Sequence, residues 1–205
     1  MSFASLCHVV VDLETLGRKP GCPILEIGAA AQIGGNIILP FSAHPNLQEQ
    51  HQAGMVADPA TVLWWMSNDP TMEKAREHQF QGHGKEGELG EPVCKALMDF
   101  SAFLGLVGEA CEVRIWGNSA RFDLGILEEL YHRFHIEVPW KFWEERDLRT
   151  VFELLEPEHA IVRDFDKMPY HTGLGDASYE LSRLLLALRR LDDMNNGFTA
   201  VPVPE

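Results

Sequence analysis

Short apolar runs separated by turn residues fill the N-terminal part of the chain. The run at 7–12 (CHVVVD) is rich in β-branched residues and predicts a buried strand that ends at an acid. The runs at 24–33 and 36–43 predict two further strands, and the glycines at 34–35 predict a hairpin turn between them. Three consecutive strands favour an antiparallel meander, to which the run at 112–116 adds a fourth strand.

Apolar positions at helical spacing dominate the rest of the chain. They predict helices at 93–107, 123–134, 146–155 and 175–191, and shorter helices after Asp58-Pro59 and after Pro70. The stretch 82–92 is rich in glycine and charge and predicts a loop. Periodicity ends at Leu191, so a single domain is expected over 1–191 and a mobile tail over 192–205.

Composition limits what these elements can build. A chain of 205 residues with 45% hydrophobic content can bury one substantial core. It has neither a basic, apolar leader nor a stretch long enough to span a bilayer, so a soluble, cytoplasmic protein without a membrane partner is expected. The four cysteines lack the spacing of a CxxC pair or a zinc site and predict reduced, mostly buried thiols.

Acidic residues give the chain a net charge of −14. This charge argues against a protein that coats nucleic acid through a broad basic face. Divalent cations bound in an acidic site would reverse the field there, so an enzyme with weak nonspecific affinity for nucleic acid stays compatible with the charge.

One acid pair differs from the others in its position. Acid-x-acid pairs also occur at 86–88, 156–158 and 164–166, so the pattern alone is weak evidence. Asp12 and Glu14, however, end a hydrophobic strand, where period-two alternation directs both side chains to one face. Two neighbouring carboxylates repel each other, and a divalent metal ion is the natural compensator.

Two more acids and a histidine extend this set. Asp123 shares a helical stripe with Leu127 and Leu130, which must face the core; the alternative is that it only caps its helix. His171 lies in a glycine-containing loop five residues before Asp176 at a helix start, and taken singly it could equally be a solvated loop residue. Together the acids could hold two divalent ions for phosphodiester hydrolysis, with His171 as general base.

Three segments carry a family resemblance: VVVDLETLG, WGNSARFDLGIL and HTGLGDA. In this order they resemble the motifs of the DEDD (DnaQ-like) superfamily of 3′→5′ exonucleases in its histidine (DEDDh) subgroup, nearest to phage DexA-type exonucleases and small bacterial exoribonucleases. The resemblance implies a ribonuclease H-like α/β fold: a five-stranded mixed sheet in the order 3-2-1-4-5 with helices on both faces. It also implies Mg²⁺ or Mn²⁺, two ions per active site, held by the acids that the motifs contain: Asp12, Glu14, Asp123 and Asp176.

The resemblance implies contacts with the terminal nucleotide as well. Thr15, Leu16 and Gly17 are expected against it, with Leu16 wedged at the base. Further candidates, each with a structural alternative, are Trp64 or Trp65 for base stacking or core packing, Asn118 and Arg121 for phosphate binding or a turn, and Arg146 and Arg149 for substrate contact or surface pairing. The fifth strand is sought in 137–146.

The function expected from these features is metal-dependent release of nucleoside 5′-monophosphates from single-stranded DNA or RNA with a free 3′ end. One alternative is a catalytically silent nucleic-acid-binding or interaction module of the same fold. Another is endonucleolytic cleavage of RNA·DNA hybrids, which the His-x4-Asp motif disfavours. The sequence leaves RNA and DNA undecided, and it is compatible with a homodimer.

Overall fold

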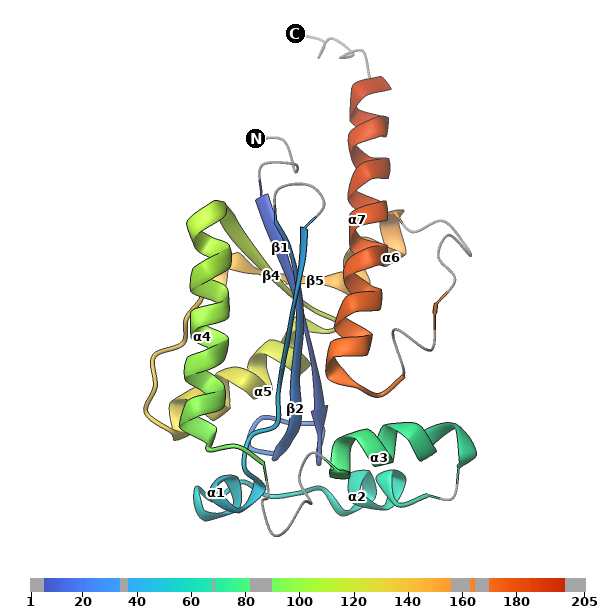
Figure 1. Ribbon diagram of the computed structural model, residues 1–205. Coiled ribbons are helices and arrows are strands. Elements are labelled where there is room, and N and C mark those ends of the chain that lie inside the picture. Colours follow the sequence, from blue (N-terminus) through green and yellow to red (C-terminus); the bar gives the residue numbers. More distant parts are fainter. Residues whose placement is uncertain are drawn as a thin grey trace, which may run out of the picture.

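The computed structural model describes residues 6–33, 37–67, 69–81, 90–155, 163–164 and 170–197, and they build one mixed sheet with helices around it (Figure 1). In chain order the elements are β1 (Leu6–Thr15), β2 (Ile24–Ile33), β3 (Ile37–Ala43), α1 (Leu47–Gln52), α2 (Pro59–Trp65), η2 (Pro70–Met72), α3 (Glu73–Gln81), α4 (Val93–Ala110), β4 (Glu112–Gly117), α5 (Ala120–Arg133), η3 (Phe142–Glu144), β5 (Glu145–Asp147), α6 (Leu148–Leu155) and α7 (Gly173–Gly197).

The sheet has the strand order β3-β2-β1-β4-β5. β2 runs antiparallel to both β1 and β3, whereas β4 is parallel to β1 and β5 is parallel to β4. This confirms the five-stranded mixed sheet in the expected order. The glycines at 34–35 and most of the loop at 82–92 lie outside the described residues.

Successive side chains of β1 point to opposite faces of the sheet and pack in two separate cores. Cys7, Val9 and Val11 pack in the core formed with α4 and α5, whereas Val10 packs with α7 on the other face. Figure 1 shows the same division, with α4 and α5 on one side of the sheet and α6 and α7 on the other. The even-numbered Asp12 and Glu14 therefore lie on the α7 face of β1.

Several boundaries differ from the sequence-based expectation. The fifth strand covers only Glu145–Asp147, because most of 137–146 is irregular or 3-10 helical, and a three-residue strand leaves no alternation to detect. The last helix begins at Gly173 and continues to Gly197, past the expected end at Leu191. The rest of the expected tail, 198–205, lies outside the described residues.

The cysteines also differ from the expectation of reduced thiols. Cys7 and Cys111 form a disulfide, with their Cα atoms 5.6 Å apart, whereas Cys22 is buried and free and Cys94 is exposed and free. The two bonded residues are 104 positions apart in the sequence, and only the parallel pairing of β1 with β4 brings them together.

None of the helices in the described ranges combines the length and the apolar character that a bilayer crossing requires.

Candidate active site

The end of β1 supplies the first two acids. Glu14 is buried and Asp12 is partly exposed, and both point from the sheet toward the beginning of α7. The backbone of α7 comes very close here: a Cβ atom built on Gly173 would lie 2.9 Å from the carbonyl oxygen of Asp12. Glycine at this position therefore lets the helix start directly beside the acid pair.

Asp123 reaches the same place from the opposite face. It lies in the first turn of α5 with 2% of its surface exposed, and the backbone N–H of Leu13 donates to its Oδ1 at 3.3 Å. A Cβ atom on Gly117 would lie 3.0 Å from its Oδ2, so glycine at the end of β4 leaves room for the carboxylate. Asp123 thus bonds across to β1 instead of serving only as a cap of its own helix.

Asp176 and His171 are tied to each other at the start of α7. Oδ2 of Asp176 accepts the backbone N–H of His171 at 2.8 Å, and His171 has a positive φ of 54°. Ligand atoms of Glu14, His171 and Asp176 all lie within 4.8 Å of one another. The structure therefore brings one acid of the first motif, Glu14, together with the histidine and the acid of the third motif.

Two further charged residues take part that the sequence did not reveal. Glu180, one helical turn after Asp176, is buried, and Asn118 Nδ2 donates to its Oε1 at 2.6 Å. Arg163 is buried and its Nη1 donates to Oδ1 of Asp176 at 2.6 Å. The i, i+4 spacing from Asp176 was the sequence feature that could have indicated Glu180. The local sequence offers no such feature for Arg163.

Burial, together with repulsion between neighbouring carboxylates, raises the pKa of the acids in this site. Burial, followed by repulsion from Asp123, Glu180 and the other carboxylates, holds the pKa of Asp12 well above its usual value, and burial does the same for Glu14. Burial also raises the pKa of Asp123 to about 7, although the hydrogen bond from Leu13 works against it, and raises that of Glu180 to about 8. Such a cluster attracts positive charge strongly.

His171 shifts in the opposite direction. Burial lowers its pKa below the usual value, although the nearby carboxylate of Asp176 acts against the shift. The imidazole is therefore neutral at neutral pH and can accept a proton.

The buried oxygen atoms fit a cation. Asp123 Oδ2 and Glu180 Oε2 accept no hydrogen bond from the described residues, although both atoms are inaccessible to solvent. Buried carboxylate oxygens normally have donors or a metal ion as partners. Carboxylates clustered in this way match the ligands that Mg²⁺ and Mn²⁺ prefer.

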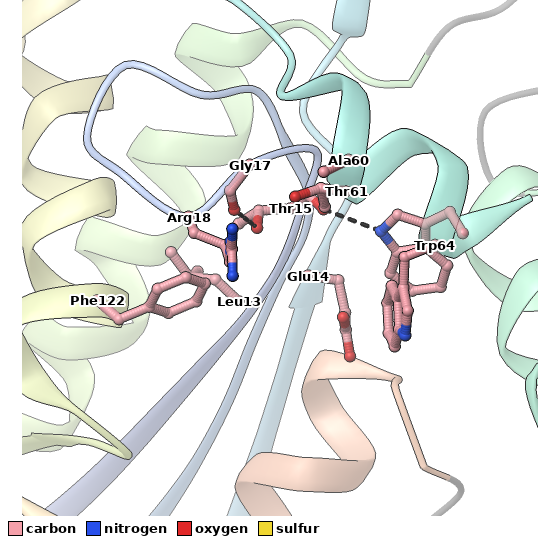
Figure 2. Close-up of a pocket in the computed structure, with 10 residues that line it drawn as sticks. Leu13, Glu14, Thr15, Gly17, Arg18, Ala60, Thr61, Trp64 and Phe122 are labelled. Atoms are coloured by element: carbon pink, nitrogen blue, oxygen red, sulfur yellow. Dashed lines mark hydrogen bonds between the residues drawn. The ribbon is translucent and has the colours of Figure 1, made fainter.

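A pocket of about 420 Å³ opens beside the acids (Figure 2). Its lining combines backbone and side chains from β1 and its following loop, α2 and α5: Leu13, Glu14, Thr15, Gly17, Arg18, Ala60, Thr61, Trp64, Trp65 and Phe122. Glu14 points into it near Trp64 in Figure 2. A largely apolar pocket that ends at a carboxylate cluster suits a nucleobase whose phosphate faces the acids.

Two of the three residues expected against the terminal nucleotide belong to the lining of this pocket. Thr15 and Gly17 line the pocket, but Leu16 packs partly buried against the cluster around Trp65, and Leu13 and Phe122 occupy the lining instead. The backbone carbonyl of Thr15, just before Leu16, accepts the indole N–H of Trp65 at 2.9 Å. The expected contact of Leu16 with the terminal base stays a prediction.

The polar candidates form a network behind the acids. Asn118 bonds Glu180 with Nδ2 and accepts Arg149 Nε at 3.3 Å with Oδ1, so its side chain is engaged within the protein. Arg146 donates to the backbone carbonyls of Trp143 and Glu145. Within the described ranges neither arginine forms an ion pair with Asp147 or Glu153, which differs from the expected surface pairing.

Comparison with known proteins gives one family match. The profile of the family described as "3'-5' exoribonuclease Rv2179c-like domain" matches residues 7–185. No curated protein matches the chain.

Two solved structures share the fold. The product-bound structure of exonuclease I superposes with a TM-score of 0.55 at 16% identity over 94% of this chain, which spans only 45% of that protein. The nuclease domain of 3'hExo, described as a DEDDh family member bound to rAMP, gives 0.53 at 11% identity over 94% of this chain and 95% of that one. At these identities the likeness establishes the ribonuclease H-like fold.

Proposed function

The chain belongs to the 3'-5' exoribonuclease Rv2179c-like domain family and is a 3′→5′ exonuclease, and we propose that it releases nucleoside 5′-monophosphates from single-stranded RNA. RNA is preferred over DNA in this proposal because the family is described as exoribonucleases. The family implies a nucleic-acid substrate and dependence on a divalent metal. Mg²⁺ or Mn²⁺, two ions per site, is the proposed cofactor.

One observation supports this proposal most strongly. Glu14 at the end of β1 and Asp176 at the start of α7 have ligand atoms within 4.8 Å of one another and of His171, and Asp123 at the start of α5 accepts the N–H of Leu13 on β1. Buried oxygens of Asp123 and Glu180 have no donor among the described residues. A binding module without turnover would have no need to retain such a costly arrangement of charge.

The proposed chemistry divides the tasks among the residues. When bound, the divalent ions would supply positive charge that favours the attacking hydroxide and the departing 3′-oxygen. Asp12, Glu14, Asp123 and Asp176 would hold them. Neutral His171 would take the proton of the attacking water, and the pocket beside Trp64 would hold the terminal base so that its phosphate meets the acids.

We also propose that residues 1–191 form one exonuclease domain, which α7 extends to Gly197. The homodimer and the cytoplasmic location stay predictions.

An assay on labelled ends tests the proposed reaction. Single-stranded RNA and a DNA of the same sequence, each labelled at the 5′ end in one sample and at the 3′ end in another, are incubated with Mg²⁺, with Mn²⁺ or with a chelator. We expect immediate release of 3′-labelled mononucleotide, a shortening ladder from the 5′-labelled strand, faster cleavage of RNA, and no reaction with the chelator. Cleavage of a circular strand would exclude an end-dependent enzyme, and no cleavage with either metal would favour a silent binding module.

A further inference from the structure

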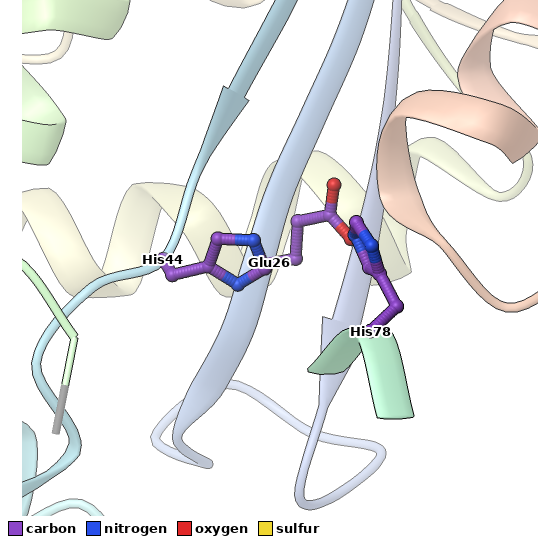
Figure 3. A group of neighbouring side chains, drawn as sticks. All are labelled: Glu26, His44 and His78. Carbon is purple, nitrogen blue, oxygen red and sulfur yellow. The ribbon is translucent and has the colours of Figure 1, made fainter. Parts of the chain in front are cut away.

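One fully buried carboxylate, on β2, is not among the acids assigned to metal binding. Glu26 lies on β2, directly opposite Glu14 in the antiparallel register, with none of its surface exposed. Figure 3 shows it between His44, at the end of β3, and His78 on α3. The chemistry proposed above gives Glu26 no task, yet an ion at this depth is costly unless donors surround it.

Donors from three elements surround the Glu26 carboxylate. They are Ser42 Oγ from β3 at 2.8 Å, Gln79 Nε2 and His78 Nε2 from α3 at 2.6 and 3.2 Å, and the backbone N–H groups of Gly173 and Leu174 from α7 at 2.8 and 3.2 Å. Burial opposes ionisation, but the hydrogen bonds from His78 and Gln79 outweigh it and lower the pKa of Glu26 to about 2. Glu26 is therefore ionised at neutral pH.

The cluster of Glu26, His44 and His78 has the composition of a metal site, but its hydrogen bonds argue against one. Oε1 already accepts from Ser42 and Leu174, and Oε2 accepts from three donors. A carboxylate has about four acceptor sites, so a metal ion would have to displace donors that the fold provides. The Glu26 carboxylate is therefore fully engaged with donors of the protein, and we call it and these donors the hub.

The hub holds the beginning of α7. The N–H groups of Gly173 and Leu174 are among the first of this helix and have no partner within it, and the helix dipole favours negative charge there. Packing fixes the same point, because a Cβ atom on Gly28 would lie only 1.8 Å from the carbonyl carbon of Gly173. The start of α7 is therefore anchored to β2 by both charge and close contact.

The anchored segment carries the proposed general base and a proposed metal ligand. His171 precedes Gly173 by two residues, and Asp176 lies in the first turn of α7. Gln79 also links Glu26 directly to His171, because its Nε2 donates to the backbone carbonyl of His171 at 3.2 Å. Movement of the helix start would thus displace His171 relative to Glu14, and displacements of about 1 Å can cost on the order of 10² in rate.

We propose that Glu26 is a positioning residue that fixes the start of α7 and thereby orients His171 and Asp176 against the acids of β1. This role rests on the proposed function of His171. Because Gln79 and His78 of α3 also donate to Glu26, this carboxylate connects α3 with the start of α7.

The test compares Glu26→Gln with a matched control, Glu49→Gln. Glu49 likewise accepts a backbone N–H at a helix start, that of Val93 at 2.8 Å, but this is α4, away from the acids. We expect Glu26→Gln to lower kcat about 10–100-fold with KM changed less than about 2-fold, whereas Glu49→Gln keeps the kcat of the original protein. In a His171→Ala background, Glu26→Gln should add a smaller loss than in the original protein, because the part of its effect that acts through His171 is already gone and only the part that acts through Asp176 is left.

Hydrogen exchange separates this role from the proposed enzyme activity. The amide protons of Gly173 and Leu174, followed by NMR, should exchange faster in Glu26→Gln than in the original protein. In Glu49→Gln they should exchange at the original rate. Should Glu26→Gln fail to fold, Gln79→Met removes the donor to both Glu26 and His171 and should lower kcat about 2–10-fold. Unchanged exchange, an unchanged kcat, or a full additional loss in the His171→Ala background would overturn the proposal. An inactive original protein with the expected exchange would refute only the proposed function.

Discussion

At the scale of single residues, Trp64 and Trp65 show how adjacent aromatic side chains divide binding from packing. Trp64 is 43% exposed and its ring centroid lies 5.1 Å from that of His171, whereas Trp65 is 1% exposed and bonds the backbone of Thr15. Trp64→Ala should raise KM for single-stranded RNA by an amount equivalent to roughly 1–3 kcal/mol of lost stacking, with a small change in melting temperature. Trp65→Ala should cost about 3–5 kcal/mol of folding stability. The reverse pattern in KM and thermal melts would contradict this division.

His171 is expected to affect proton transfer and leave metal binding intact. His171→Ala should slow turnover about 10²–10⁴-fold, as for loss of a general base, while binding of Mn²⁺ followed by electron paramagnetic resonance stays close to normal. Because burial lowers the pKa of His171, the original protein should lose activity only as the pH falls below about 6.5. Normal turnover in His171→Ala would remove the proposed base.

Sequence could predict the residues that break a local pattern. Asp12, Glu14 and Asp123 were recognisable because charges stood on core-facing positions of a strand and a helix. Arg163 and Glu180 were not, because their burial depends on how α7 docks on the sheet, which no spacing along the chain records. The hydrogen bond from Trp65 to Thr15 was unpredictable for a similar reason, because it joins residues 50 positions apart.

At the scale of elements, the docking of α7 on β2 depends on two glycines. Gly28→Ala would place a Cβ atom 1.8 Å from the backbone of Gly173, so α7 would have to move. We expect a loss of about 1–3 kcal/mol or more, together with a fall in exonuclease activity. Gly125→Ala on α5 is the control: its Cβ atom would meet nothing within 4 Å, and removing a helical glycine should stabilise by up to about 1 kcal/mol. Denaturant unfolding of the two variants measures both effects, and equal stabilities would contradict the close contact.

Elements with a strong period were predictable from sequence, whereas short ones were not. The continuous apolar runs of β1 and β2 and the apolar stripes of α4, α5 and α7 are long enough to identify their type. β5 has three residues, and its place depends on pairing with β4. The helix α1 was missed because its six residues, LQEQHQ, carry one apolar side chain and are held by buried Gln50, which bonds the backbone of β2.

At the scale of the whole molecule, the clustered acids should make the metal-free protein less stable as the pH rises. The pKa values of Asp123 and Glu180 are raised to about 7 and about 8, so the folded state binds more protons than the unfolded chain above the ordinary carboxyl pKa near 4. The contribution of these protonated carboxyl groups to the free energy of unfolding is therefore fully present below the ordinary carboxyl pKa. It is lost as the pH rises through their raised pKa values of about 7 and about 8. His78, whose pKa is raised beside Glu26, adds a loss of the same sign at higher pH.

Thermal melts in a chelator at pH 5 to 8 measure this dependence. Melting temperature should fall across the range, by roughly 2–4 °C for each kcal/mol lost. Added Mg²⁺ should restore it most at pH 8, and Asp123→Asn should flatten the metal-free curve. A metal-free stability that stays level or rises from pH 5 to 8 would show that burial does not raise the pKa of these carboxyl groups.

The exonuclease activity of Asp123→Asn, compared with Glu129→Gln, tests most directly whether the acid cluster drives the reaction. Both residues lie on α5, but Asp123 is buried among the acids and Glu129 pairs with Arg133 on the surface. With 3′-labelled single-stranded RNA and Mg²⁺, we expect Glu129→Gln to release mononucleotide at the rate of the original protein. Asp123→Asn, folded and melting no lower than the original protein without metal, should release none. Equal release by the two variants would contradict a metal-dependent exonuclease centred on these carboxylates.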